Sequence, residues 1–393
     1  MSSSAPATSS PAISSPAISS PAISSFLPPK RTLMGPGPSN VPQRILDAMA
    51  RPTIGHLDPA FTDMMEQTKI LLRYAFQTEN KLTFPVSGPG SVGMETCFVN
   101  LVEPGDKVIV CINGVFGGRM LENVKRCGGV PVVVEDAWGR AVDAAKVEAT
   151  FAAHPDCKIL AFVHAETSTG ALSDAAALAA IARKRGALSL MDCVTSLGGV
   201  PVLIDAWGID AAYSGSQKCL SCTPGLSPVT FSERAIKKVR ARKTPVQSWF
   251  MDLNLVLGYW SGEGKRTYHH TAPINPLYGL HEALVMLAEE GLEAAWARHR
   301  AMHEALKTGL ENLGLRFVVP EGERLPQLNS VYLPADIDDA ACRARLLSEF
   351  NLEIGAGLGV LAGKIWRIGL MGASASQHHV DYCLKALAAV LGK

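Results

Sequence analysis

Short apolar runs recur through the first half of the chain and alternate with stretches of helical periodicity. The apolar runs lie at residues 107–112, 130–135, 158–163 and 188–191, with a shorter one at 208–212. The helical stretches between them lie at residues 119–127, 141–153 and 174–184. Strands without polar alternation are buried on both faces, and their alternation with helices is typical of a parallel sheet. The pattern therefore predicts an α/β fold whose mostly parallel sheet is covered by helices.

Longer helical stretches flank this region. Three are predicted before it, at about residues 42–50, 61–78 and 92–102. After about residue 276, helical stretches reaching 291, at 292–313 and at 340–350 accompany strand-like runs at 330–333 and 365–369. This change predicts a large domain at residues 29–290 and a smaller C-terminal α+β domain at residues 291–393, with a hinge at residues 289–292.

The first 25 residues form a different kind of segment. Ser-Ser-Pro-Ala-Ile occurs three times, beginning at Ser9, Ser14 and Ser19, and no charged side chain is present. Such a segment cannot bury enough apolar surface to offset its ordering entropy, so residues 1–28 are predicted to be a disordered tail. A lack of acids is typical of organelle-targeting segments, but this one has no arginine and its prolines interrupt any helix. Whether the tail is a targeting signal stays open.

Composition narrows the class of partner. The 393 residues carry 37 Lys and Arg against 36 Asp and Glu, a net charge of +1. The chain therefore lacks the basic surplus of a nucleic-acid-binding protein. No apolar run approaches the roughly 20 residues of a membrane span. Nine scattered cysteines predict reduced thiols in a cytoplasmic protein. The expected partner is a small molecule, with neither nucleic acid nor membrane.

Chemically useful residues follow several of the predicted strands. Phe116 comes after the first run, Thr167 after the third, Asp192 after the fourth, and the fifth leads into Tyr213-Ser-Gly-Ser-Gln-Lys218. Ligands of open parallel sheets bind beyond the carboxyl ends of the strands. The sequence therefore predicts an aromatic ring, a hydroxyl, a carboxylate and an amine on one edge of the sheet.

Two glycine-rich turns precede predicted helices. Gly88-Pro-Gly-Ser91 leaves backbone N–H groups unpaired at a helix start, where an anion is favoured. The turn lacks the lysine of a Walker loop and the glycine spacing of a dinucleotide fingerprint. The other turn, Met34-Gly-Pro-Gly-Pro-Ser-Asn40, is either a plain helix entry or a place where backbone approaches a ligand.

This set of groups matches the needs of pyridoxal 5'-phosphate. That cofactor requires a lysine for its Schiff base, a carboxylate that keeps the pyridine nitrogen protonated, an anion site for the phosphate, and an aromatic face against the ring. The sequence supplies these four groups in the same order: Lys218, Asp192, the glycine-rich turn at residues 88–91, and Phe116. The sequence therefore predicts a pyridoxal-phosphate enzyme.

Five motifs, in a fixed order, carry a family resemblance. They are Gly35-Pro-Gly-Pro-Ser-Asn40, His164-Ala-Glu-Thr-Ser-Thr-Gly170, Asp192-Cys-Val-Thr-Ser-Leu-Gly-Gly199, Ser214-Gly-Ser-Gln-Lys218 and Tyr268-His-His-Thr271. With them the chain resembles the alanine-glyoxylate / serine-pyruvate aminotransferases, within the class V pyridoxal-phosphate aminotransferases, from about Leu33 to its end. The resemblance implies a fold-type I, aspartate aminotransferase-like homodimer with active sites at the subunit interface.

The resemblance also implies roles for individual residues. Lys218 would form the internal aldimine and shuttle the proton, and Asp192 would pair with the pyridine nitrogen. The other cofactor-binding residues would be Gly90, Ser91 and Gln217 at the phosphate, Thr167 at the ring hydroxyl, Phe116 stacked where many members carry tryptophan, and Tyr268 and Thr271 reaching the phosphate from the neighbouring subunit. No metal site is expected.

The substrate carboxylate needs its own partner. A planar guanidinium binds a carboxylate through two parallel hydrogen bonds. Arg367, in Lys364-Ile-Trp-Arg367-Ile-Gly, matches the arginine of the family and is assigned this role. Closure of the C-terminal domain about its hinge could carry Arg367 toward the lysine.

The predicted activity is transfer of an amino group from alanine or serine to glyoxylate or pyruvate by a ping-pong mechanism through Lys218. Ureidoglycine-glyoxylate and 3-hydroxykynurenine transaminases are the nearest alternatives. A cysteine desulfurase is more remote, because no cysteine is placed by an obvious flexible loop. A non-catalytic dimeric scaffold is the alternative from a different class, and the intact lysine, aspartate and arginine argue against it.

Overall fold

The computed structural model describes residue 21 and residues 23–260, 266–335 and 337–393. The chain divides into two units, Met1–Lys30 and Arg31–Lys393. Most of the predicted disordered tail lies outside the described residues, and the described residues up to 28 are exposed and belong to no helix or strand. The description below concerns Arg31–Lys393.

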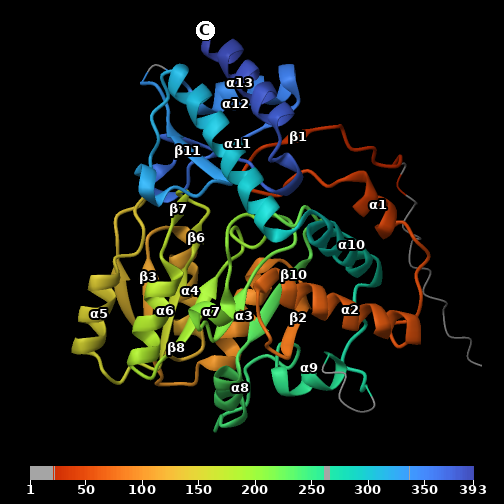
Figure 1. Ribbon diagram of the computed structural model, residues 1–393, viewed down its shortest axis with the longest axis vertical. Coiled ribbons are helices and arrows are strands. Elements are labelled where there is room, and N and C mark those ends of the chain that lie inside the picture. Colours follow the sequence, from red (N-terminus) through yellow and green to blue (C-terminus); the bar gives the residue numbers. More distant parts are fainter. Residues whose placement is uncertain (1–20, 22, 261–265, 336) are drawn as a thin grey trace, which may run out of the picture. The chain divides into compact units, whose positions relative to one another are not determined.

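A seven-stranded sheet forms the centre of this unit, with the strand order β2-β10-β9-β8-β5-β3-β4 (Figure 1). Its strands are β2 (Leu82–Ser87), β3 (Lys107–Ile112), β4 (Val130–Glu135), β5 (Ile159–Val163), β8 (Leu188–Asp192), β9 (Ala211–Tyr213) and β10 (Leu226–Phe231). The pairs among β3, β4, β5, β8 and β9 are parallel, and β10 is antiparallel to both of its neighbours. The prediction of a mostly parallel α/β sheet is confirmed.

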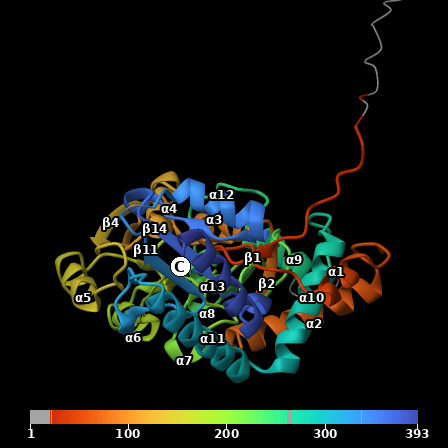
Figure 2. The same cartoon turned by 90° about the horizontal axis from the view of Figure 1, so that it is seen from above.

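Helices cover both faces of this sheet. They are α3 (Gly90–Leu101), α4 (Val115–Arg126), α5 (Ala144–Ala153), α6 (Ala175–Lys184), α7 (Ile204–Trp207) and α8 (Glu233–Arg240). In Figure 2, α3 and α4 lie on one side of the sheet and α6 and α7 on the other, in agreement with the contacts of α3 with β9 and β10 and of α6 with β8. Further helices in this part are α1 (Gln43–Met49), α2 (Pro59–Phe76), α9 (Leu253–Trp260) and α10 (Ile274–Glu290).

A second, smaller core lies around an antiparallel sheet with the order β11-β14-β13. Its elements are α11 (Leu292–Asn312), β11 (Leu328–Tyr332), α12 (Asp339–Phe350), β13 (Gly355–Ala356), β14 (Ile365–Gly369) and α13 (Gln377–Leu391). Trp366 and Ile368 of β14 are fully buried in this core, and so is Met34 from the start of the unit. Met34 arrives there because β1 (Thr32–Leu33) pairs with β12 (Leu352–Glu353). The predicted α+β character of the C-terminal part is confirmed.

Short elements complete the fold. They are β6 (Ala165–Glu166), β7 (Ala171–Leu172) and the 3₁₀ turns η1 (Glu321–Glu323), η2 (Gly359–Leu361) and η3 (Gly372–Ser374). None of the helices in the described ranges is both long and apolar enough to cross a membrane.

The sequence pattern misses β2 and β10. Both strands contain a proline, Pro85 and Pro228, which weakens the strand signal, and the two residues face each other across the antiparallel pair. Proline has no backbone N–H to donate, and β2 tolerates it because it is an edge strand. The start of α4 is also predicted too late, at residue 119 instead of Val115, because Gly117 and Gly118 resemble a loop.

Candidate active site

A cavity of about 180 Å3 lies beyond the carboxyl ends of β8 and β9 and beside the N-termini of α3 and α4. It is lined by Pro89, Gly90, Ser91, Met94, Phe116, Arg119, Thr167, Asp192, Val194, Tyr213, Gln217 and Lys218. The cavity thus brings together the predicted lysine and the residues that one subunit is predicted to contribute to the cofactor ring and phosphate. They are Lys218, Asp192, Thr167, Phe116, Gly90, Ser91 and Gln217.

Asp192, the last residue of β8, is almost fully buried at one end of this cavity. Its Oδ1 accepts a hydrogen bond from the Val194 N–H at 2.8 Å, and its Oδ2 accepts one from the Tyr213 hydroxyl at 2.7 Å. Burial raises the pKa of this carboxyl to about 6, against the opposing effect of these two hydrogen bonds. A desolvated carboxylate of this kind is strongly stabilised by a positive group placed beside it.

Lys218 follows β9 and is 8% exposed. Burial, and then the positive charge of Arg367, lowers the pKa of its amine to about 8. About a tenth of the amine is therefore neutral at pH 7, many times more than for an exposed lysine, and the neutral form is the one that acts as nucleophile or proton acceptor. Its Nζ donates a hydrogen bond to the carbonyl oxygen of Pro36.

The N-terminus of α3 lines another part of the cavity with Pro89, Gly90 and Ser91. Pro89 precedes the helix and supplies no side-chain cap, so the first N–H groups of α3 are available to a ligand. Gly88 has φ +144°, and a Cβ there would lie 2.5 Å from a methyl group of Val92, so the turn requires glycine. Gln217 also lines the cavity, and its buried Oε1 has no hydrogen-bond partner among the described residues.

Phe116 forms an aromatic wall at the start of α4. The guanidinium carbon of Arg119 lies 4.9 Å from the centroid of its ring, a cation–π contact. Arg119 has no predicted role. Because residues three apart share one face of a helix, the spacing of Phe116 and Arg119 was a usable signal, but the late predicted start of α4 concealed it.

Glu166 is the main buried charge that sequence reasoning left without a role. It is fully buried, and its carboxylate accepts hydrogen bonds from the N–H and hydroxyl of Ser168 and from the Phe116 N–H at 3.2 Å. Burial raises the pKa of this carboxyl to about 7. Its negative charge also favours the charged form of Arg367. Glu166 therefore connects the start of α4 with the arginine electrostatically.

Arg367 lies on the central strand of the smaller sheet, outside the residues that line the cavity. Its Nε donates to the Ala356 carbonyl at 2.7 Å and its Nη1 to the Thr167 carbonyl at 3.0 Å. Burial lowers the pKa of its guanidinium to about 10, and the group remains cationic near neutral pH. The bond to Thr167 links Arg367 to the wall of the cavity.

Tyr268 and Thr271 do not line this cavity. Tyr268 is 63% exposed, and Thr271 is also exposed. The side chain of Trp249 is exposed nearby and stacks on His269, with ring centroids 4.6 Å apart. Within a single chain, these two residues are therefore not assembled with Lys218.

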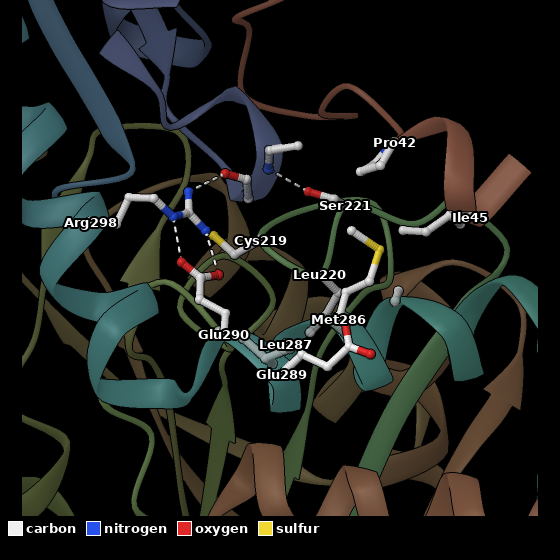
Figure 3. Close-up of a pocket in the computed structure, with 14 residues that line it drawn as sticks. Pro42, Ile45, Cys219, Leu220, Ser221, Met286, Leu287, Glu289, Glu290 and Arg298 are labelled. Carbon is white, nitrogen blue, oxygen red and sulfur yellow. Dashed lines mark hydrogen bonds and ion pairs between the residues drawn. The ribbon is translucent and has the colours of Figure 1, made fainter.

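A larger cavity, of about 360 Å3, lies behind the loop that follows Lys218 (Figure 3). Its polar groups are already paired: Arg298 forms an ion pair with Glu290 at 2.6 Å, and Ser221 Oγ accepts a hydrogen bond from the Ala373 N–H at 2.7 Å. We assign no chemistry to this cavity.

A buried lysine and a buried aspartate therefore meet at the strand ends of an α/β sheet. Comparison with known proteins gives the family. The model of the class-V aminotransferases matches residues 32–375. The chain belongs to this family and is a transaminase. Enzymes of this family generally depend on pyridoxal phosphate.

Individual relatives agree with this assignment. An alanine–glyoxylate aminotransferase of Oryctolagus cuniculus is 41% identical over 362 residues, which are 91% of this chain and 92% of that protein. An (S)-ureidoglycine–glyoxylate transaminase of Bacillus subtilis is 38% identical over 381 residues, 92% of this chain and 91% of that protein. The crystal structure of an alanine–glyoxylate aminotransferase from Nostoc sp. superimposes with a TM-score of 0.92 at 47% identity, covering 94% of this chain and 97% of that one.

The buried carboxyl of Glu166 predicts a specific pH dependence of stability. The folded protein holds this proton up to about pH 7, whereas the unfolded chain releases it near the ordinary value of 4.5. The free energy of unfolding should therefore fall as pH rises between these values, by on the order of 3 kcal/mol from this group. In Glu166→Gln that part of the decline disappears, which urea unfolding at a series of pH values would measure.

The matched control is Glu135→Gln, at an exposed position, which should keep the wild-type dependence. Equal slopes in the wild type and in Glu166→Gln would contradict the assigned titration.

Proposed function

We propose that this transaminase binds pyridoxal 5'-phosphate in the cavity of Lys218 and moves an amino group from alanine or serine to glyoxylate or pyruvate. The observation that carries the proposal is one cavity holding both a buried amine of lowered pKa, Lys218, and a buried carboxylate, Asp192. The general pyridoxal-phosphate dependence of the family supports the choice of cofactor.

The described side chains fit this cofactor in charge and in shape. The uncapped start of α3, at Gly90 and Ser91, and the unpartnered Gln217 suit a phosphate. Asp192 suits a protonated ring nitrogen, Thr167 a ring hydroxyl, and Phe116 one face of the ring.

The proposed mechanism follows from the properties of these residues. When bound, pyridoxal phosphate supplies a protonated ring that withdraws the electrons left by a departing Cα proton. Asp192 keeps the ring nitrogen protonated, because the desolvated carboxylate is stabilised by the positive charge. Lys218 takes the proton from Cα of the amino acid and returns it, since its amine is neutral in part near neutral pH.

Arg367 would hold the substrate carboxylate during this proton transfer. Within the described part of the chain its hydrogen bonds use Nε and Nη1. Nη2 is therefore the group we assign to the substrate. The amino acid and the acceptor oxo-acid both bind through Arg367. The oxo-acid formed from the donor must therefore leave before the acceptor binds. We propose that the part of the chain around the larger core and the part around the smaller core, to which Met34 also belongs, close over this site, supported by the separate hydrophobic clusters of the two parts.

The names of the relatives agree on the amino acceptor and differ in the amino donor. The alanine–glyoxylate aminotransferases and the (S)-ureidoglycine–glyoxylate transaminase named above share glyoxylate and differ in the donor. Glyoxylate is thus the first acceptor to test. The ureidoglycine relative covers as much of this chain as the alanine relative does, and this makes (S)-ureidoglycine the second candidate donor.

We also propose a homodimer in which Tyr268 and Thr271 complete the phosphate site of the partner subunit. Their exposure, and their position outside the cavity of their own chain, support this arrangement. The exposed aromatic ring of Trp249 beside them is typical of an interface. As the compartment we propose the cytoplasm, supported by nine buried, unpaired cysteines.

Donor choice can be measured with glyoxylate as the acceptor and a panel of amino donors. We expect alanine or serine to give a kcat/KM at least about tenfold above that of aspartate or glutamate, because Arg367 is assigned to one substrate carboxylate and Arg119, the arginine in the cavity lining, packs on the ring of Phe116. A kcat/KM for (S)-ureidoglycine about tenfold above both small donors would replace the proposed donor. Activity with none of these donors would overturn the proposed function.

Sharing of the active site between subunits can be tested by mixing two inactive variants. Lys218→Ala lacks the amine, and Tyr268→Ala/Thr271→Ala lacks the groups from across the interface. After subunit exchange, a mixed dimer contains one site with all wild-type groups, so activity should appear on mixing.

Mixing Lys218→Ala with Lys218→Arg is the control and should recover nothing. Absence of recovery in the first mixture, with mixed dimers demonstrated by mass spectrometry, would contradict the shared site.

A further inference from the structure

The turn Gly35-Pro36-Gly37-Pro38 lies against the side chain of Lys218. The Lys218 Nζ donates its hydrogen bond to the Pro36 carbonyl oxygen. We propose that this carbonyl is the docking point of the Lys218 amine whenever the amine is not bonded to the cofactor, and that Gly37 keeps the docking point open. The inference rests on the proposed function and makes Pro36 and Gly37 positioning residues.

Gly37 is the residue that the docked amine requires. Its φ is +99°, and a Cβ on it would lie 2.5 Å from Lys218 Nζ, 2.7 Å from Cδ and 2.9 Å from Cε. Any side chain at this position would displace the docked lysine. Gly35, two residues earlier, differs: a Cβ there would lie no closer than 3.7 Å to its neighbours, an ordinary contact. The turn therefore contains its own matched control position.

Hydrogen bonds hold the turn in register with the lysine. The Ser39 N–H donates to the Gln217 carbonyl at 2.9 Å, and the Ser39 hydroxyl donates to the Lys218 carbonyl at 2.8 Å. Ser39 is almost fully buried. The Pro36 carbonyl is thus fixed relative to the backbone from which the lysine side chain extends.

The same turn is fixed to the sheet that carries Arg367. The Met34 N–H donates to the Glu353 carbonyl at 2.9 Å, and the Gly369 N–H donates to the Met34 carbonyl at 2.7 Å. Gly369 ends β14, the strand of Arg367. The Pro36 carbonyl and Arg367 therefore lie on two backbone segments that are hydrogen-bonded to each other.

A docking point is needed because the surroundings of the amine disfavour its charged form. Burial and the positive charge of Arg367 both oppose an ammonium at Lys218, while the negative charge of Asp192 favours it. Both Asp192 oxygens already accept hydrogen bonds, from Val194 and Tyr213. When a donor amine displaces Lys218, the Pro36 carbonyl offers an N–H of the released amine an acceptor. After the amine has taken the Cα proton, the same carbonyl stabilises the ammonium until the proton returns to the substrate.

The test uses the holoenzyme after the first half-reaction, prepared with alanine and no oxo-acid. The rate of arylation of Lys218 by 1-fluoro-2,4-dinitrobenzene is followed by peptide mass spectrometry across pH in the wild type, Gly37→Ala and Gly35→Ala. Loss of the charge-assisted hydrogen bond in Gly37→Ala should lower the pH midpoint of labelling by on the order of one unit. Gly35→Ala should keep the wild-type midpoint.

An unchanged midpoint in Gly37→Ala, or an equal shift in Gly35→Ala, would overturn the docking inference. A crystal structure of the wild type in the same state gives a second measurement that needs no variant. We expect Nζ within about 3.2 Å of the Pro36 oxygen, and an amine directed elsewhere would refute the inference. The cofactor absorbance separates the two hypotheses: if alanine and the other donors leave it unchanged, the proposed function fails and the docking inference fails with it.

Discussion

Burial of the Lys218 amine between a carboxylate and a guanidinium is the constraint on which the rest of the site depends. An exposed lysine would be almost fully protonated near neutral pH, whereas desolvation and the charge of Arg367 bring its pKa to about 8. The same burial raises the pKa of Asp192 to about 6. The fold therefore brings the Lys218 amine closer to the balance between its protonated and neutral forms, which suits repeated proton transfer. It also provides a desolvated carboxylate, Asp192, that a positive group would stabilise.

The fold meets this constraint by combining two cores. The parallel strands end at one edge and deliver Asp192 and, through the loop after β9, Lys218. The smaller antiparallel sheet delivers Arg367, whose hydrogen bond to the Thr167 carbonyl reaches the wall of the cavity. The segment at Met34 joins both parts, because it is buried in the smaller core and leads directly to the turn that receives the lysine.

Local sequence patterns predicted the parallel strands, the lysine and the aspartate, because each depends on periodicity or on a position at a strand end. The bounds of β3, β4 and β14 were predicted to the residue. Features that depend on distant contacts were not predictable in this way. The carboxyl of Glu166 is significant because α4, 50 residues earlier in the chain, begins against it. The role of Pro36 arises from a contact with Lys218 across 182 residues. No local pattern carries such information, and the glycines at the start of α4 concealed Arg119 as well.

Replacement of Lys218 by alanine, with the exposed Lys184→Ala as control, tests the central claim most directly. The account predicts that Lys218→Ala loses the visible absorbance of the covalently held cofactor and that turnover falls by at least about a thousandfold, because both the nucleophile and the proton carrier are removed. Lys184→Ala should retain both properties. Retention of the absorbance and of turnover in Lys218→Ala would contradict the account.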